Sequence, residues 1–105
     1  MSVERRAFVL DRVHAKQDVS DASRFGEITY VFAPGEMPPP IFSHSFVAES
    51  LKRLETFDEL RDYFVISGNQ VAITLIVAHL VAKHGSLNLL LYDSAQREYV
   101  HKTVQ

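Results

Sequence analysis

The sequence predicts an α/β fold with a single five-stranded mixed sheet and two helices on one face of that sheet. Short runs rich in β-branched and aromatic residues lie between turn residues, which is typical of strands. Two longer segments carry apolar residues at helical spacing and have capping residues at their ends. Along the chain these segments follow the order β-β-α-β-α-β-β, which predicts two strand-helix-strand crossovers flanked by an antiparallel strand at each end.

The first two strands are expected at residues 5–13 and 27–32. The first contains an unbroken apolar run, and the second is enriched in β-branched and aromatic residues. Gly26 before the second strand and Pro34 after it are typical strand boundaries. The polar stretch 14–24 between the two strands is expected to form an exposed loop.

The first helix is expected to begin near Ser43, after the stiff proline run 38–40. Glu49 and Arg53 are four residues apart on its polar side, where an ion pair would stabilise the helix. The apolar side of this helix is formed by Phe46, Val47, Leu51 and Leu54. Residues 56–59 fit a capping-box pattern, which predicts a further short helical turn directly after this helix.

A short apolar strand at 63–66 precedes the second helix. Ser67 is expected to cap that helix, because its hydroxyl group can accept a hydrogen bond from the amide of Gln70. The helix is expected to run to His84 and to end at Gly85, which can adopt the left-handed conformation.

Two strands complete the predicted sheet, at 87–92 and 98–104, with a turn at 93–97. The first of them is nearly all apolar, as expected for a strand that is covered on both faces. With right-handed crossovers, the simplest arrangement is a sheet whose strand order follows the chain. Both helices then lie on one face, and the other face is uncovered.

The second helix has apolar residues on both of its sides. One side carries Val71, Leu75, Ala78 and Ala82, and the opposite side carries Ala72, Ile76, His79 and Lys83. We assign the second group to the outer surface, which is then too apolar for a free helix. Either Ile76 packs beneath the first helix, or this surface mediates self-association. The second alternative predicts a homodimer, a tetramer or another symmetric assembly.

The length of 105 residues favours one domain, 1–105. Hydrophobic residues make up 47%, charged residues 23%, and the formal net charge is -2, which excludes disorder and a strongly basic binder of duplex nucleic acid. Cysteine is absent, so disulfides and thiolate chemistry are excluded. The sequence starts without an apolar signal core, and its longest apolar run, 71–82, is too short to span a membrane. A soluble, cytoplasmic protein with no membrane partner is therefore expected.

The expected binding edge lies where the carboxyl ends of the parallel strands meet the starts of the helices. Donors and a close backbone approach for a small anionic molecule, such as a nucleotide, would come from His44, Ser45, Ser67, Gly68 and Asn69. Asp93, at the end of the fourth strand, would lie beside them. Two structural alternatives stay open, since residues 67–69 can be only a helix cap and Asp93 only a turn residue.

Four short segments, 64–68, 78–79, His84 and 91–93, carry a resemblance to a known family. Together they resemble the small CRISPR-associated ring nucleases first described as manganese-dependent RNA deadenylases. The resemblance implies cleavage of cyclic tetra-adenylate, Mn²⁺ as a possible cofactor, His84 as acid or base, and Asp93 as metal ligand or base. His84 precedes the fourth strand and Asp93 ends it, so the resemblance also implies a site shared between subunits.

Three functions therefore follow from the sequence. The leading hypothesis is a small self-associating domain that binds an anionic small molecule. The second is a metal-assisted ring nuclease acting on a cyclic oligoadenylate. The third is a phage or regulatory protein-interaction module without catalysis, whose uncovered apolar sheet face binds another protein.

Overall fold

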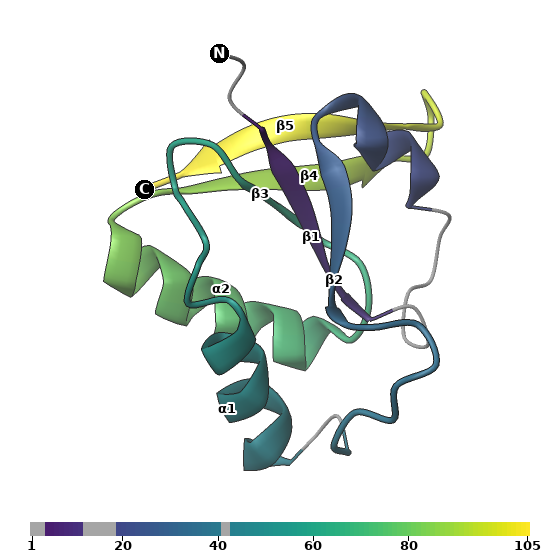
Figure 1. The fold of residues 1–105 in the computed structure, drawn as a ribbon. Helices are drawn as coiled ribbons and strands as arrows, with labels where there is room; N and C mark the ends of the chain where they lie inside the picture. Colours follow the sequence, from purple (N-terminus) through teal and green to yellow (C-terminus); the bar gives the residue numbers. More distant parts are fainter. Residues whose placement is uncertain (1–3, 12–18, 41–42) are drawn as a thin grey trace.

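The computed structural model describes residues 4–11, 19–40 and 43–105, and its five strands form one mixed sheet in the order β2-β1-β3-β4-β5 (Figure 1). The strands are β1 (Arg6–Asp11), β2 (Glu27–Phe32), β3 (Tyr63–Val65), β4 (Leu87–Asp93) and β5 (Glu98–Val104). The first four are parallel to one another, and β5 runs antiparallel to β4. The helices are α1 (His44–Arg53), α2 (Gln70–His84) and the short 3-10 helix η1 (Ser20–Arg24). The α/β class, the five strands and the two α-helices are confirmed.

The position of β1 differs from the predicted order along the chain. β1 lies inside the sheet between β2 and β3, and it pairs with β2 in parallel rather than antiparallel orientation. Ala7, Phe8, Val9 and Leu10 are all buried. A strand with consecutive buried residues needs cover on both faces, which favours an interior position over an edge.

The short helix η1 covers part of the sheet face opposite α1 and α2, so the prediction of an uncovered face is wrong. In the described part of the predicted loop 14–24, Ser20, Ser23 and Arg24 are exposed as predicted, whereas Val19 and Ala22 are buried. Val19 and Ala22 pack there against Val9, Leu90 and Tyr99. The connection from β1 to β2 crosses the sheet in the opposite direction to the connection from β3 to β4. The right-hand rule therefore assigns the two connections to opposite faces. Residues 14–18 of the predicted loop, and residues 12–13 of the predicted first strand, lie outside the described residues.

The short helix η1 also closes part of the free edge of β5. The Tyr99 N–H donates to Asp21 Oδ2 at 2.8 Å, and Arg24 Nη2 donates to the Tyr99 carbonyl oxygen at 2.9 Å. Arg24 Nε in turn donates to Asp21 Oδ1 at 3.0 Å. The outward backbone groups of Tyr99 are thus satisfied within the chain, so they cannot pair with an added strand.

The Asp21 carboxylate makes stability depend on pH. Its hydrogen bonds from Arg24, and then from the Tyr99 amide, hold the pKa of Asp21 below its ordinary value of 3.8. A lowered folded-state pKa stabilises the fold above the unfolded-state pKa, and this contribution is lost as the pH falls through the folded-state pKa. We expect wild type to be more stable than Asp21→Asn at pH 7, with the difference shrinking from pH 5 to pH 2. Urea unfolding across that pH range measures it, and a difference that stays constant would contradict the assignment.

The starts and ends of the two helices follow local capping chemistry. Ser43 caps α1, with its hydroxyl group accepting from the Phe46 amide at 3.2 Å, and Gly85 ends α2 with φ 84°, both as predicted. The cap of α2 is Asn69 rather than Ser67, because the Asn69 side chain accepts from two amides of the first turn. Gly68, with φ 120°, turns the chain between the buried Ser67 and this cap.

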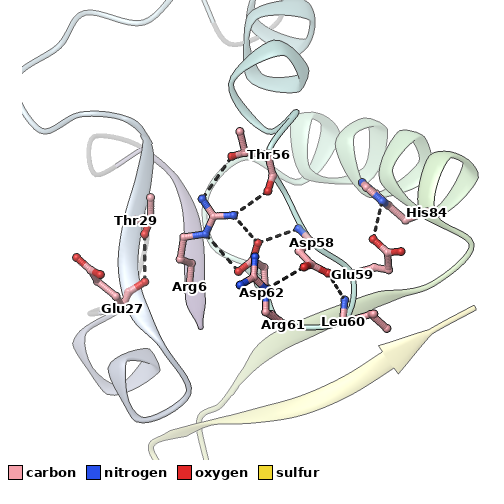
Figure 2. A network of polar contacts seen from close by, with 10 residues as sticks. All are labelled: Arg6, Glu27, Thr29, Thr56, Asp58, Glu59, Leu60, Arg61, Asp62 and His84. Carbon is pink, nitrogen blue, oxygen red and sulfur yellow. Dashed lines mark hydrogen bonds and ion pairs between the residues drawn. The ribbon is translucent and has the colours of Figure 1, made fainter. Parts of the chain in front are cut away.

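The segment 56–62 contains the predicted short helical turn, but this turn begins at Asp58 and not at Thr56. The Asp62 N–H donates to the Asp58 carbonyl oxygen at 2.8 Å, which closes one helical turn that is not continued. Asp62 is completely buried and accepts from Arg6 Nη2 at 2.8 Å and from the Asp58 amide at 2.8 Å. Arg6 also donates to the carbonyl oxygen of Thr56 at 2.7 Å. Figure 2 shows the Arg6 guanidinium group between Thr56 and Asp62. A contact with a distant strand, which a local pattern cannot reveal, holds this turn.

The helix α2 turns a different side toward solvent from the one predicted. Of the four residues assigned to its outer surface, His79 and Lys83 are exposed, but Ala72 and Ile76 are buried, and Ile76 lies in the core with α1 as in the first of the two predicted alternatives. Ile76, assigned to the outer surface, is 0% exposed, whereas Val71 and Leu75 on the other side are 54% and 45% exposed. Ala78 and Ala82 are exposed on that same side. Packing against both α1 and the sheet selects the bulkier side of the helix, with Ile73, Ile76 and Leu80, for the core.

Candidate functional site

The predicted binding edge contains a hollow between the start of α2 and the end of β4. It has a volume of ≈ 410 Å³ and is lined by Ile66, Ser67, Gly68, Gln70, Ile73, Thr74, Leu91 and Tyr92. Ser67 and Gly68 therefore lie together, as expected. Asn69 is not in this lining, and its side-chain oxygen accepts from the amides of Val71 and Ala72 at 2.9 and 3.2 Å. The free amides that an anion would need at this helix start are thus occupied.

His44 and Ser45 lie at the start of α1, apart from the strand-end hollow. Both are exposed. His44 lines a different hollow, of ≈ 280 Å³, which lies between α1 and α2 and also includes Val71, Leu75 and His79. The five ligand-binding candidates are therefore divided between two surfaces.

Asp93 acts as a turn residue between β4 and β5. Its Oδ1 accepts from the amides of Ala95 and Gln96 at 3.0 and 3.3 Å. These bonds fix the tight connection that lets β5 fold back on β4. The hydrogen bonds that the Asp93 carboxylate makes are therefore those of a turn residue, the structural alternative given for Asp93.

His84 lies at the other end of β4, at the end of α2. Its Nδ1 pairs with Glu59 Oε2 at 3.0 Å, a contact drawn in Figure 2. The His84 ring packs on Phe57. Glu59 is the partner that sequence reasoning missed, because it comes from a turn distant along the chain. His84 and Asp93 are thus not brought together within one chain. Among the residues that the structure describes, no group of three or more His, Cys, Asp or Glu side chains could hold a metal ion.

A wide apolar groove lies between α2 and the strands β4 and β5. Its volume is ≈ 640 Å³, and it is lined by Ile66, Ile73, Thr74, Val77, Ala78, Val81, Ala82, Leu89, Leu91 and Val104. β4 and β5 are joined by a turn, whereas β3 and β4 are joined by a crossover helix that covers the sheet. The sheet surface beside α2 therefore has no second crossover helix over it.

The exposed side of α2 forms an apolar ridge beside this groove. We define the α2 ridge as Val71, Leu75, Ala78 and Ala82, all exposed. The ridge contains no charged residue, and Ala78 and Ala82 belong to both the ridge and the groove lining. The α2 ridge and the groove therefore form one continuous apolar surface.

No helix within the described ranges, 4–11, 19–40 and 43–105, is long and apolar enough to cross a membrane.

The comparisons with known proteins identify a phage family. A family model described as phage Pam3 gp32-like protein matches residues 4–105, nearly the whole chain. Neither a curated protein nor a solved structure matches the chain. The predicted resemblance to CRISPR-associated ring nucleases is therefore wrong. A strand, a Ser-Gly turn, a helix and a second strand recur in many parallel α/β sheets, so this pattern does not distinguish one family from another.

Proposed function

Because the chain belongs to the phage Pam3 gp32-like family, we propose that it is a phage protein-interaction module whose role is binding and not catalysis. The proposed docking face is the α2 ridge with the apolar groove beside it. One observation carries the proposal: α2 turns Val71 and Leu75, 54% and 45% exposed, toward solvent. Continuous exposed apolar surfaces are typical of protein-protein contacts, which supports this proposal.

The energetics of the docking face support a protein partner. Complete burial of one exposed valine or leucine side chain contributes about 1.5–3 kcal/mol to association. Val71 and Leu75 are already half-covered, so each offers part of that amount, and the partly exposed Leu91 and Val104 add to it across the groove. These burial energies add up only if one partner covers α2 and the strands β4 and β5 at the same time. A surface as large as a helix or strand of another protein can do so.

The strand-end hollow offers less support for the second candidate, binding of an anionic small molecule. Asn69 already accepts hydrogen bonds from the first-turn amides Val71 and Ala72. His44, a predicted anion donor, lies in a different hollow. Of the predicted donors, Ser67 and Gly68 thus share one hollow and His44 lies in another, whereas the apolar residues of the docking face are continuous.

Site-specific photo-crosslinking tests the proposed docking face. A photoreactive phenylalanine analogue replaces Leu75 in one sample and Glu55, an exposed residue after α1, in the matched control. The purified chain is irradiated alone and after mixing with the purified products of its neighbouring genes. We expect an adduct, with the chain itself or with one of those proteins, from position 75 and not from position 55. If position 75 gives no adduct in any mixture, the result would contradict the proposed docking face.

Thermal unfolding of the same purified chain separates the two candidate functions. A ligand that binds only the folded state raises the melting temperature by mass action. ATP and inorganic phosphate are the probes. An unchanged melting temperature is the result that the protein-interaction function requires, and a rise that saturates with ATP would favour the anionic ligand instead.

A further inference from the structure

The α2 ridge has the spacing of a helix-helix contact. Its members, Val71, Leu75, Ala78 and Ala82, follow one another at intervals of four, three and four residues. This alternation is the a and d pattern by which two helices pack side by side in a coiled coil. The ridge is exposed over its whole length, so a second helix can approach it. The occupant indicated by this geometry is a helix.

The side-chain sizes along the ridge are complementary to the ridge of a second copy in antiparallel orientation. The first half carries the large residues Val71 and Leu75, and the second half carries the small residues Ala78 and Ala82. In an antiparallel pair related by a two-fold axis, Leu75 of each copy faces Ala78 of the other, and Val71 faces Ala82. Large side chains opposite small ones fill space without voids or clashes. A parallel pair would instead place leucine against leucine and alanine against alanine.

The charges on α2 favour the same orientation. The basic residues of the helix, Lys83 and His84, lie in its last turn, and no acidic residue lies in its first turn. An antiparallel pair separates the two Lys83 ammonium groups to opposite ends of the contact and aligns the two helix dipoles favourably. A parallel pair would bring those ammonium groups side by side.

The groove adds contact area to the same arrangement. Ala78 and Ala82 line both the ridge and the groove, and across the groove lie Leu89, Leu91 and Val104. A helix that packs beside α2 on this side therefore also covers the apolar surface of β4 and β5. Because ridge and groove are adjacent on each copy, a two-fold axis lets each α2 cover part of the other copy's groove.

From these observations we infer that a second copy of this chain docks on the α2 ridge, with the two α2 helices antiparallel and Leu75 of each copy facing Ala78 of the other. This inference rests on the proposed function, since it names the partner of the proposed docking face. It gives the chain a self-complementary interface and a closed dimer rather than an open filament.

A pair of charge variants tests both the partner and the orientation. Size-exclusion chromatography with light scattering is expected to give wild type twice the mass of one chain. Leu75→Lys alone and Ala78→Glu alone are each expected to weaken the dimer about a hundredfold, because apolar contacts are lost on both sides of the two-fold axis. Mixing the two variants is expected to restore a dimer, because the introduced ammonium group of one then faces the introduced carboxylate of the other.

Controls distinguish loss of the interface from loss of the fold. Both variants change exposed positions on a helix, so their far-ultraviolet circular dichroism is expected to match wild type. Lys52→Glu, an exposed change on α1, is expected to leave the dimer intact. A wild-type chain that remains monomeric, or a variant mixture that does not form heterodimers, would overturn the inference. If position 75 nevertheless crosslinks to another protein, the proposed function stands and only the second copy is excluded.

Discussion

Replacing Ile76 with alanine is expected to lower the free energy of unfolding by about 2–5 kcal/mol, the range for large-to-small changes at a buried site. Ile76 is 0% exposed and belongs to the core between α1, α2 and the sheet. Its truncation removes buried apolar contacts and leaves a cavity that rigid neighbours such as Phe46 and Phe64 cannot fill. Urea unfolding of the wild type and the variant measures the loss.

Leu75 is the matched control for this prediction, because it is the next residue and lies on the same helix. It is 45% exposed, so Leu75→Ala is expected to cost less than about 1 kcal/mol in the monomer. Both variants are compared at protein concentrations at which wild-type unfolding no longer depends on concentration. Equal losses, or a larger loss for Leu75→Ala, would mean that α2 is rotated relative to the structure.

Replacing Asp62 with alanine is expected to cost about 1–3 kcal/mol, the range for a buried donor that loses its acceptor, because the ion-pair partner Arg6 is itself partly exposed. The carboxylate is completely buried and accepts from Arg6 Nε at 3.3 Å, Arg6 Nη2 at 2.8 Å and the Asp58 amide at 2.8 Å. Its removal leaves the Arg6 guanidinium group and the Asp58 N–H without this acceptor, and Arg6 then contacts the 56–62 turn through Thr56 alone. Chemical unfolding at pH 7 is the measurement.

Two further variants show which property of Asp62 causes the expected loss of stability. Asp62→Asn keeps the size of the side chain and one acceptor oxygen but removes the charge, so an intermediate loss is expected. Glu55→Ala, at an exposed position, is expected to change stability by no more than about 0.5 kcal/mol. If Asp62→Ala were as mild as Glu55→Ala, the contacts of Asp62 with Arg6 and Asp58 drawn in Figure 2 would contribute nothing measurable to stability.

The features that the sequence predicts well are those that depend on near neighbours along the chain. Ser43 caps α1 within one turn, Gly85 ends α2, and Glu49 pairs with Arg53 at 3.0 Å. Each of these requires only residues three or four positions apart. The bounds of β2 and β5 are also predicted, since turn residues flank both strands.

The features that the sequence predicts poorly depend on contacts between residues that are distant along the chain. The interior place of β1 follows from its pairing with β3, and the attachment of the 56–62 turn to β1 follows from the Arg6 and Asp62 contact. The orientation of α2 was ambiguous, because both sides of the helix are apolar and only packing against α1 and the sheet distinguishes them. The groove could not be predicted either, since it depends on which strands α2 leaves uncovered.

The hairpin of β4 and β5 has a consequence for the order in which the chain folds. It is the one strand pair of the described sheet whose members are joined by a tight turn, with Asp93 paired to Glu98. Closing such a short loop costs little entropy, whereas pairing Ala7 with Tyr63 requires a long loop to close. During synthesis, β1 therefore has one unpaired edge until residues 63–65 have been made. A high proportion of non-local pairing slows folding, so the nascent amino-terminal half exposes apolar strand surface for longer than a helical bundle of equal length would.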